Sequence, residues 1–226
     1  MKQLMIICAA VFFASASTQS AVAQAQSADI PRFETALSQA TTAQDIHRLI
    51  RAGADVNERF ASGDTVLITA AASCGPETVQ ALIDHGADVN LAGYNGARTA
   101  LMEATAYSGA AMVRVLLDAG ADPNLTDMYG RTALMTAAAR DDRESMRLLL
   151  DAGADINAAD GDIGMTPLMY AAWSGAPETI QFLLDRGADA GVITYNRWYA
   201  YDYAGFNEKL AGTRVLQTLS EAVPQA

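Results

Sequence analysis

The sequence is poor in basic residues, and this limits the partners it can bind. Only 15 lysines and arginines stand against 26 acidic residues, which gives a formal net charge of -11, and Lys2 and Lys209 are the only lysines. Because nucleic-acid binding needs basic patches that neutralise phosphates, we expect no nucleic-acid partner. The acidic balance instead favours a partner protein that presents a basic face.

The N-terminal segment has no hydrophobic run long enough to span a membrane. Its apolar stretch at residues 4–14 has 11 residues, short of the roughly 20 that a bilayer requires. This stretch follows a positively charged start and precedes small residues at 21–25, which is typical of a secretory signal peptide. We therefore expect residues 1–25 to be cleaved and the mature protein to be periplasmic, without membrane insertion. An uncleaved anchor is the alternative.

Cysteine is scarce as well. Cys8 lies in the predicted signal peptide, so Cys74 is the single thiol of the mature chain, and no intramolecular disulfide can form. A lone thiol could be a redox or intermolecular site. However, corresponding positions further along the chain hold Asp141 and Gly175, which favours a tolerated substitution in a turn.

Motifs that carry chemistry are missing. The chain has no phosphate-binding glycine loop, zinc motif or serine nucleophile elbow. The only histidines, His47 and His85, are expected on the surface and too far apart to share a metal. The acidic run at residues 155–162 fails the ligand order of a calcium loop and is interpreted as a loop insertion. We therefore predict no catalytic residue, no cofactor, no metal site and no enzymatic activity.

A repeated segment dominates the rest of the chain. Its glycines are spaced 33, 34, 33 and 34 residues apart, and it reads Gly-Ala-Asp followed by two more residues, the last usually Asn. Such a period predicts a solenoid, because each unit can bury its apolar face only against its neighbours. The segment occurs at residues 52–57, 85–90, 119–124, 152–157 and 186–191.

Each unit predicts two helices. A threonine at residues 65, 99, 132 and 166 is placed to cap a first helix, with an inward-facing leucine two residues later and several alanines that allow close stacking. A second helix follows, with apolar residues at i, i+3 and i+4. The glycine after it is a left-handed C-cap, and the Asp and Asn are expected to make local turn bonds rather than bind cations.

The Thr-Ala-Leu-Met motif at residues 132–135, together with the Gly-Ala-Asp segment, resembles the ankyrin repeat in the variant common in bacterial members. The resemblance covers about residues 30–220. It implies an all-α solenoid of stacked helix-turn-helix units with short finger loops. The family's usual histidine is replaced by Ile68, Met102, Met135 and Met169, which suggests apolar packing in place of its hydrogen-bond network.

The pattern also predicts how the chain is divided. The end units depart from the motif, as the caps of a solenoid should. We expect an N-terminal capping repeat at residues 26–61 and a C-terminal capping repeat with a tail at 195–226, whose last helix begins near Lys209. The four central repeats are expected at residues 62–94, 95–128, 129–161 and 162–194.

Exposed aromatic and arginine side chains mark the candidate binding surface. Such residues are enriched at the energetic centres of protein interfaces, and a solenoid aligns them on its concave face. We therefore predict a monomeric scaffold or interaction module that holds an unidentified partner protein, or alternatively an inhibitor or immunity-type protein that masks an envelope toxin or hydrolase. The predicted partner-binding residues are Tyr94, Tyr107, Tyr129, Arg140, Tyr170, Trp173 and Trp198.

Overall fold

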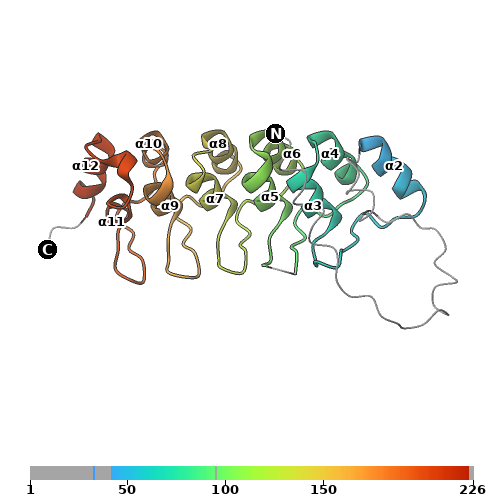
Figure 1. Ribbon diagram of the computed structural model, residues 1–226, viewed down its shortest axis with the longest axis horizontal. Coiled ribbons are helices and arrows are strands. Elements are labelled where there is room, and N and C mark those ends of the chain that lie inside the picture. Colours follow the sequence, from blue (N-terminus) through green and yellow to red (C-terminus); the bar gives the residue numbers. More distant parts are fainter. Residues whose placement is uncertain (1–32, 34–41, 95, 224–226) are drawn as a thin grey trace.

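The computed structural model describes residues 33, 42–94 and 96–223 (Figure 1). Over these residues the chain forms helices and no β-sheet, and a single isolated antiparallel bridge joins Arg59 and Thr65. No helix within the described ranges is both long and apolar enough to cross a bilayer. The predicted signal peptide at 1–25 and much of the predicted first helix of the N-terminal cap lie outside the described residues.

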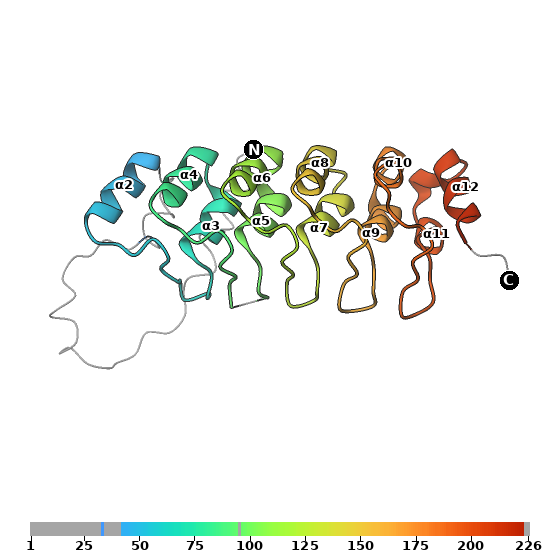
Figure 2. The same ribbon diagram turned by 180° about the vertical axis from the view of Figure 1, so that it is seen from behind.

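The helices form two layers, with the finger loops projecting from one edge (Figures 1 and 2). The layer beside the fingers, here called inner, contains α3 (Val66–Ser73), α5 (Ala100–Glu103) continued by the π-helix η2 (Ala104–Ser108), α7 (Ala133–Ala139), α9 (Pro167–Ser174) and α11 (Ala200–Ala204). The outer layer contains α2 (Ala43–Arg51), α4 (Pro76–Asp84), α6 (Ala110–Asp118), α8 (Arg143–Asp151), α10 (Pro177–Asp185) and α12 (Arg214–Glu221). The predicted all-α solenoid is confirmed.

The predicted threonines are the N-cap residues of four of the five inner helices, α3, α5, α7 and α9, and Tyr199 takes this position in α11. The hydroxyls of Thr65, Thr99 and Thr132 each accept a hydrogen bond from the backbone amide three residues later, at 3.3 to 3.4 Å. Thr166 takes the N-cap position without such a bond, and Pro167 follows it at the first helical position. Proline lacks an N–H and its fixed φ suits a helix start. The Met169 amide donates to the Thr166 carbonyl at 2.9 Å, and the Thr166 hydroxyl makes no hydrogen bond with the described residues.

Leucine and alanine fill the space between neighbouring repeats. Leu67, Leu101, Leu134 and Leu168 are all buried. Most of the alanines that follow them in the inner helices are buried as well, namely Ala70, Ala71, Ala104, Ala106, Ala137, Ala138, Ala171 and Ala172. The outer helices contribute the predicted apolar stripe, with Val79, Leu82, Val113, Leu116, Met146, Leu149, Ile180 and Leu183 buried. These side chains form one continuous core that runs the length of the stack.

The inner helix of one repeat is irregular. After Glu103 the α-helix gives way to the π-turn η2, which ends at Gly109. The hydroxyl of Thr105 donates a hydrogen bond to the carbonyl of Leu101 at 2.8 Å, and the Gly109 amide donates to Ala104. Such π-turns are frequent at functional sites. Here the turn carries Tyr107, which lies 67% exposed at its end.

The repeated Asp and Asn have different roles, and the prediction that both make only local bonds was wrong for Asn. Each Asp accepts a local bond, such as that from the Asn124 amide to Asp122 at 2.9 Å. The side chain of Asn124 instead reaches the next repeat. Its Nδ2 donates a hydrogen bond to the backbone carbonyl of Gly153 at 3.0 Å, and its Oδ1 accepts one from the backbone N–H of Asp155 at 2.8 Å. Asn57 and Asn90 make the same pair of bonds, and Asn157 makes the second of them.

Replacing one of these asparagines tests the inter-repeat bonds. We expect Asn124→Ala to lower the free energy of unfolding by about 1 kcal/mol, because two bonds to partly solvated backbone groups are lost. Urea unfolding followed by circular dichroism gives the value. Asn196, which is exposed at a finger, is the matched control, and Asn196→Ala should leave stability unchanged. An equal loss from both variants would contradict the inter-repeat role.

The finger loops are joined to one another through their backbones. The amides of Tyr94, Met128, Gly161 and Tyr195 donate to carbonyls of the preceding finger at 2.8 to 3.2 Å. Gly130 packs directly on the backbone of Gly161, and its φ of 73° is unfavourable for other residues. The fingers therefore form a continuous row beside the inner helices.

The last helix begins later than predicted. The sequence places its start near Lys209, whereas the chain first forms a short 3-10 turn at Glu208–Leu210 and α12 then begins at Arg214. Thr213 is the N-cap and accepts a bond from the Leu216 amide. Gly212, with a φ of 72°, lies between the two elements, and its backbone conformation separates them.

Candidate functional site

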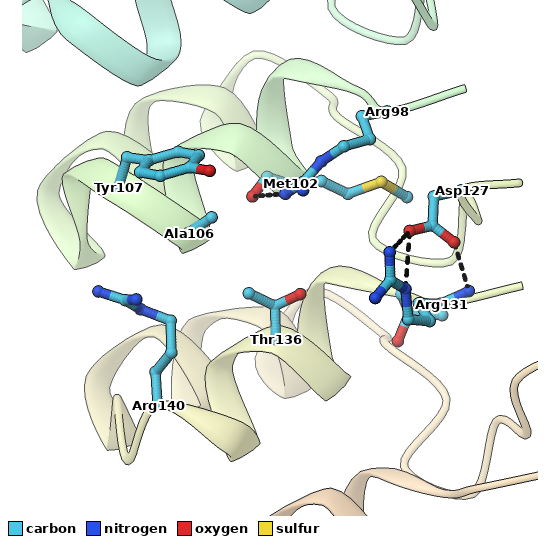
Figure 3. Close-up of a pocket in the computed structure, with 9 residues that line it drawn as sticks. Arg98, Met102, Ala106, Tyr107, Asp127, Arg131, Thr136 and Arg140 are labelled. Carbon is cyan, nitrogen blue, oxygen red and sulfur yellow. Dashed lines mark hydrogen bonds and ion pairs between the residues drawn. The ribbon is translucent and has the colours of Figure 1, made fainter. Parts of the chain in front are cut away.

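An open hollow of about 220 Å³ lies on the inner layer between η2 and α7 (Figure 3). Tyr107 and Arg140 lie at one end of it on opposite helices, and Arg131 and Asp127 lie at the other. The complete lining is Arg98, Met102, Ala106, Tyr107, Asp127, Arg131, Thr132, Thr136 and Arg140. Two successive repeats contribute, so the stacking of the solenoid creates the hollow.

Two of the three arginines of the hollow have a carboxylate partner. The Nε atom of Arg98 lies 2.6 Å from Glu103, and Arg131 donates from two nitrogens to Asp127 at 2.8 and 2.9 Å. Asp127 is buried, and its other oxygen accepts the Tyr129 and Arg131 amides. Burial raises the pKa of Glu103, and Arg98 offsets part of that rise. The carboxylates are therefore held by the site rather than presented to a ligand.

Arg140 differs from the other two arginines. It is exposed at the C-terminal end of α7, and no ion pair joins it to another residue in the part of the chain that the structure describes. Its guanidinium extends toward the preceding inner helix, η2, which carries Tyr107 (Figure 3). The sequence places these two residues at equivalent positions of successive helices, and the structure brings them to the same hollow.

Trp173 and Trp198 belong to a different cluster, nearer the C-terminus. Trp173 stacks on Tyr203 with ring centroids 6.0 Å apart, and Trp198 meets Tyr203 edge-on at 5.3 Å. Phe206 stacks on Trp198 at 5.7 Å. The buried Tyr203 was not among the predicted site residues, although its place in the last inner helix is the signal that could have found it.

Two of the finger tyrosines, Tyr94 and Tyr129, pack against an arginine. Arg59 lies 4.4 Å from the ring centre of Tyr94, and Arg131 lies 4.7 Å from that of Tyr129. Tyr94 is 76% exposed and Tyr129 is 43% exposed, so both still present a face to solvent. Arg59 is not among the predicted site residues, because the pairing joins neighbouring fingers whose two residues are 35 positions apart in the chain.

Tyr170 supports a finger loop rather than an open surface. Its hydroxyl donates to Asp160 at 2.8 Å, and burial together with this bond raises the pKa of Tyr170. The other oxygen of Asp160 accepts the amides of Ile163, Gly164 and Met165. Asp160 was predicted only as part of a loop insertion, but it is buried and accepts the hydrogen bonds that hold this finger.

The two histidines meet, contrary to the expectation that they are too far apart. Nδ1 of His47 and Nε2 of His85 are 2.7 Å apart and share a hydrogen bond. The periodic pattern places them at different helical positions, but the last turn of α4 lies beside α2 and brings His85 over His47. No cluster of three or more potential metal ligands is found among the residues that the structure describes.

Cys74 ends α3 and is partly buried. Burial raises the pKa of its thiol, and this opposes formation of the reactive thiolate. This environment favours the interpretation of Cys74 as an unreactive side chain in a turn.

Comparison with known proteins gives the family. A family model described as ankyrin repeats in three copies matches residues 33–127 and 125–194, which together make up more than two thirds of the chain. A search of curated proteins found no match. Ankyrin repeats are generic protein-interaction modules. With the repeat period, the paired helices and the row of fingers in agreement with this match, the chain belongs to the ankyrin-repeat family.

Proposed function

We propose that this chain is a non-enzymatic interaction module that binds a partner protein with its inner helix layer and finger loops. The observation that carries this proposal is the alignment of large exposed side chains over successive inner helices: Tyr107, Arg140 and Trp173. Trp173 is 56% exposed although it stacks on Tyr203. Solvent-facing aromatic and arginine side chains on a rigid support are the usual anchors of protein interfaces.

We also propose that this chain is exported to the periplasm and that its partner carries a net positive charge. The leader-like residues 1–25 support export to the periplasm, and the net charge of -11 supports attraction of a protein that is basic overall. Exposed carboxylates of the outer helices, such as Glu77, Glu144 and Glu178, contribute to that long-range field. Such a field increases the rate of encounter more than it fixes the final contacts. We propose that the module acts as a monomer.

The experiment that tests the proposal is capture of the partner from an envelope extract with the mature chain, residues 26–226. We expect the double variant Tyr107→Ala, Trp173→Ala to bind the captured protein at least tenfold more weakly, a loss of about 1.4 kcal/mol, while its helical circular dichroism is unchanged. The control is Arg114→Ala, Arg143→Ala on the outer layer, where both side chains are exposed. Equal affinity of the two double variants would show that the inner face is ordinary surface.

The identity of the captured protein distinguishes a scaffold from the alternative, an inhibitor or immunity-type protein. A scaffold would leave the activity of its partner intact. An inhibitor or immunity-type protein would capture an envelope toxin or hydrolase and abolish its activity at an equimolar ratio, because the finger row would cover the active site. Export itself is checked by fractionation, in which the cleaved chain should be found in the periplasmic fraction.

A further inference from the structure

The hollow between η2 and α7 carries a charge opposite to that of the whole chain. Three arginines and a single aspartate line it, and both oxygens of that aspartate are already bonded, to Arg131 and to backbone amides. Glu103 lies behind Arg98 and pairs with it. After these pairings Arg140 remains as a cation without a bound anion among the described residues.

Neutral donors accompany Arg140. The exposed phenol of Tyr107 and the hydroxyl of Thr136 belong to the lining, and Figure 3 shows Thr136 on α7, as Arg140 is, and Tyr107 across the hollow on η2. A lining that holds a guanidinium and two hydroxyl donors suits a carboxylate, which can accept hydrogen bonds with both oxygens. A basic side chain would instead face Arg140 and Arg131 and would be repelled.

The dimensions of the hollow favour a side chain over a large ligand. Its volume of about 220 Å³ corresponds to the space of roughly seven water molecules, and one glutamate side chain with a few waters fits such a space. It is open to solvent on the face where we propose that the partner binds. The exposed ring of Tyr107 and the side chains of Met102 and Ala106 belong to its lining and can contact an inserted group with apolar surface.

We propose that this hollow receives an acidic side chain, Asp or Glu, of the partner protein, with Arg140 as its principal contact. This proposal rests on the proposed function, since it requires that the partner binds the inner face. A partner that is basic overall, and is therefore attracted by the net negative charge of this chain, must also present one carboxylate on its surface. The local reversal of charge would set the register of the partner along the solenoid.

A double-mutant cycle with peptides tests the proposal without knowledge of the natural partner. Peptides are selected on the mature chain from a random phage-displayed library, and we expect each to contain an essential Asp or Glu. Changing that residue to the amide should weaken binding at least tenfold to the native chain, about 1.4 kcal/mol, and less than twofold to Arg140→Gln. Arg143→Gln is the matched control, an exposed arginine three residues away on the outer helix α8 that should behave as native.

The outcomes distinguish this inference from the proposed function. Peptides that lose affinity with Tyr107→Ala but show no coupling to Arg140 would leave the inner face as the binding surface and overturn its preference for an acidic group. Displacement by inorganic phosphate together with indifference to the peptide carboxylate would overturn it as well, because the hollow would then be a phosphate site. Peptides that bind undiminished to the Tyr107→Ala, Trp173→Ala variant would contradict the proposed inner face itself.

Discussion

The variant Leu134→Ala is expected to lower the free energy of unfolding by about 3 to 4 kcal/mol. Leu134 is fully buried in α7, which packs on α5 and η2 on one side and on α9 on the other. Truncation removes the transfer free energy of the side chain and leaves a cavity that the flanking helices fill only in part. Urea unfolding followed by circular dichroism measures the change.

The same variant should also alter how the protein unfolds. A solenoid is held by contacts between neighbours, so a defect in its middle separates two blocks of repeats. We expect the single urea transition of the native chain to divide into two, because the interfaces on both sides of α7 are weakened. Leu91, which is partly exposed in a turn, is the control, and Leu91→Ala should change stability by less than about 1 kcal/mol. Similar losses from both leucines would contradict the assignment of Leu134 to the central core.

The second large effect is expected from Asp160→Ala, at about 3 kcal/mol. Asp160 is 3% exposed and accepts hydrogen bonds from three backbone amides and from the Tyr170 hydroxyl. Alanine would leave these donors without an acceptor in a place that water reaches poorly, and unsatisfied buried donors are costly. Thermal and urea unfolding give the loss.

Two controls separate hydrogen bonding from charge at this position. Asp160→Asn keeps an oxygen that can accept the three amides, so it should recover more than half of the stability that Asp160→Ala loses. Asp162 is exposed two residues away, and Asp162→Ala should have almost no effect. If Asp160→Ala were as stable as Asp162→Ala, the finger would be held by its backbone bonds to neighbouring fingers alone.

The sequence was sufficient to predict the architecture, because the same short signals recur in every unit. A threonine before an apolar run and a glycine after one act locally, so their positions in the chain fix where helices begin and end. The late start of α12 could not be predicted from such local signals. The apolar pattern is not interrupted at Gly212, and only the backbone conformation there separates η3 from α12.

The contacts between repeats could not be predicted in the same way. Asn124 bonds to Gly153 and Asp155, and His47 bonds to His85, across separations set by the stacking distance rather than by helical periodicity. The candidate site shows the same limit. Equivalent positions in the repeat indicated that Tyr107 and Arg140 are neighbours, whereas the stacking of Trp173 on Tyr203 and the bond from Tyr170 to Asp160 depend on side-chain directions that a repeat pattern does not contain.

The bonds made by Asn124 allow whole repeats to be duplicated or deleted during evolution. Its amide meets only the carbonyl of Gly153 and the amide of Asp155, which are backbone groups that any copy of the unit supplies. A duplicated or deleted unit would therefore find matching partners on both sides without compensating substitutions. At the final turn Gly191 replaces the asparagine, so the forward connection is absent where this motif last occurs. The length of the array, and with it the span of partner surface that it can cover, is thus free to vary in whole units.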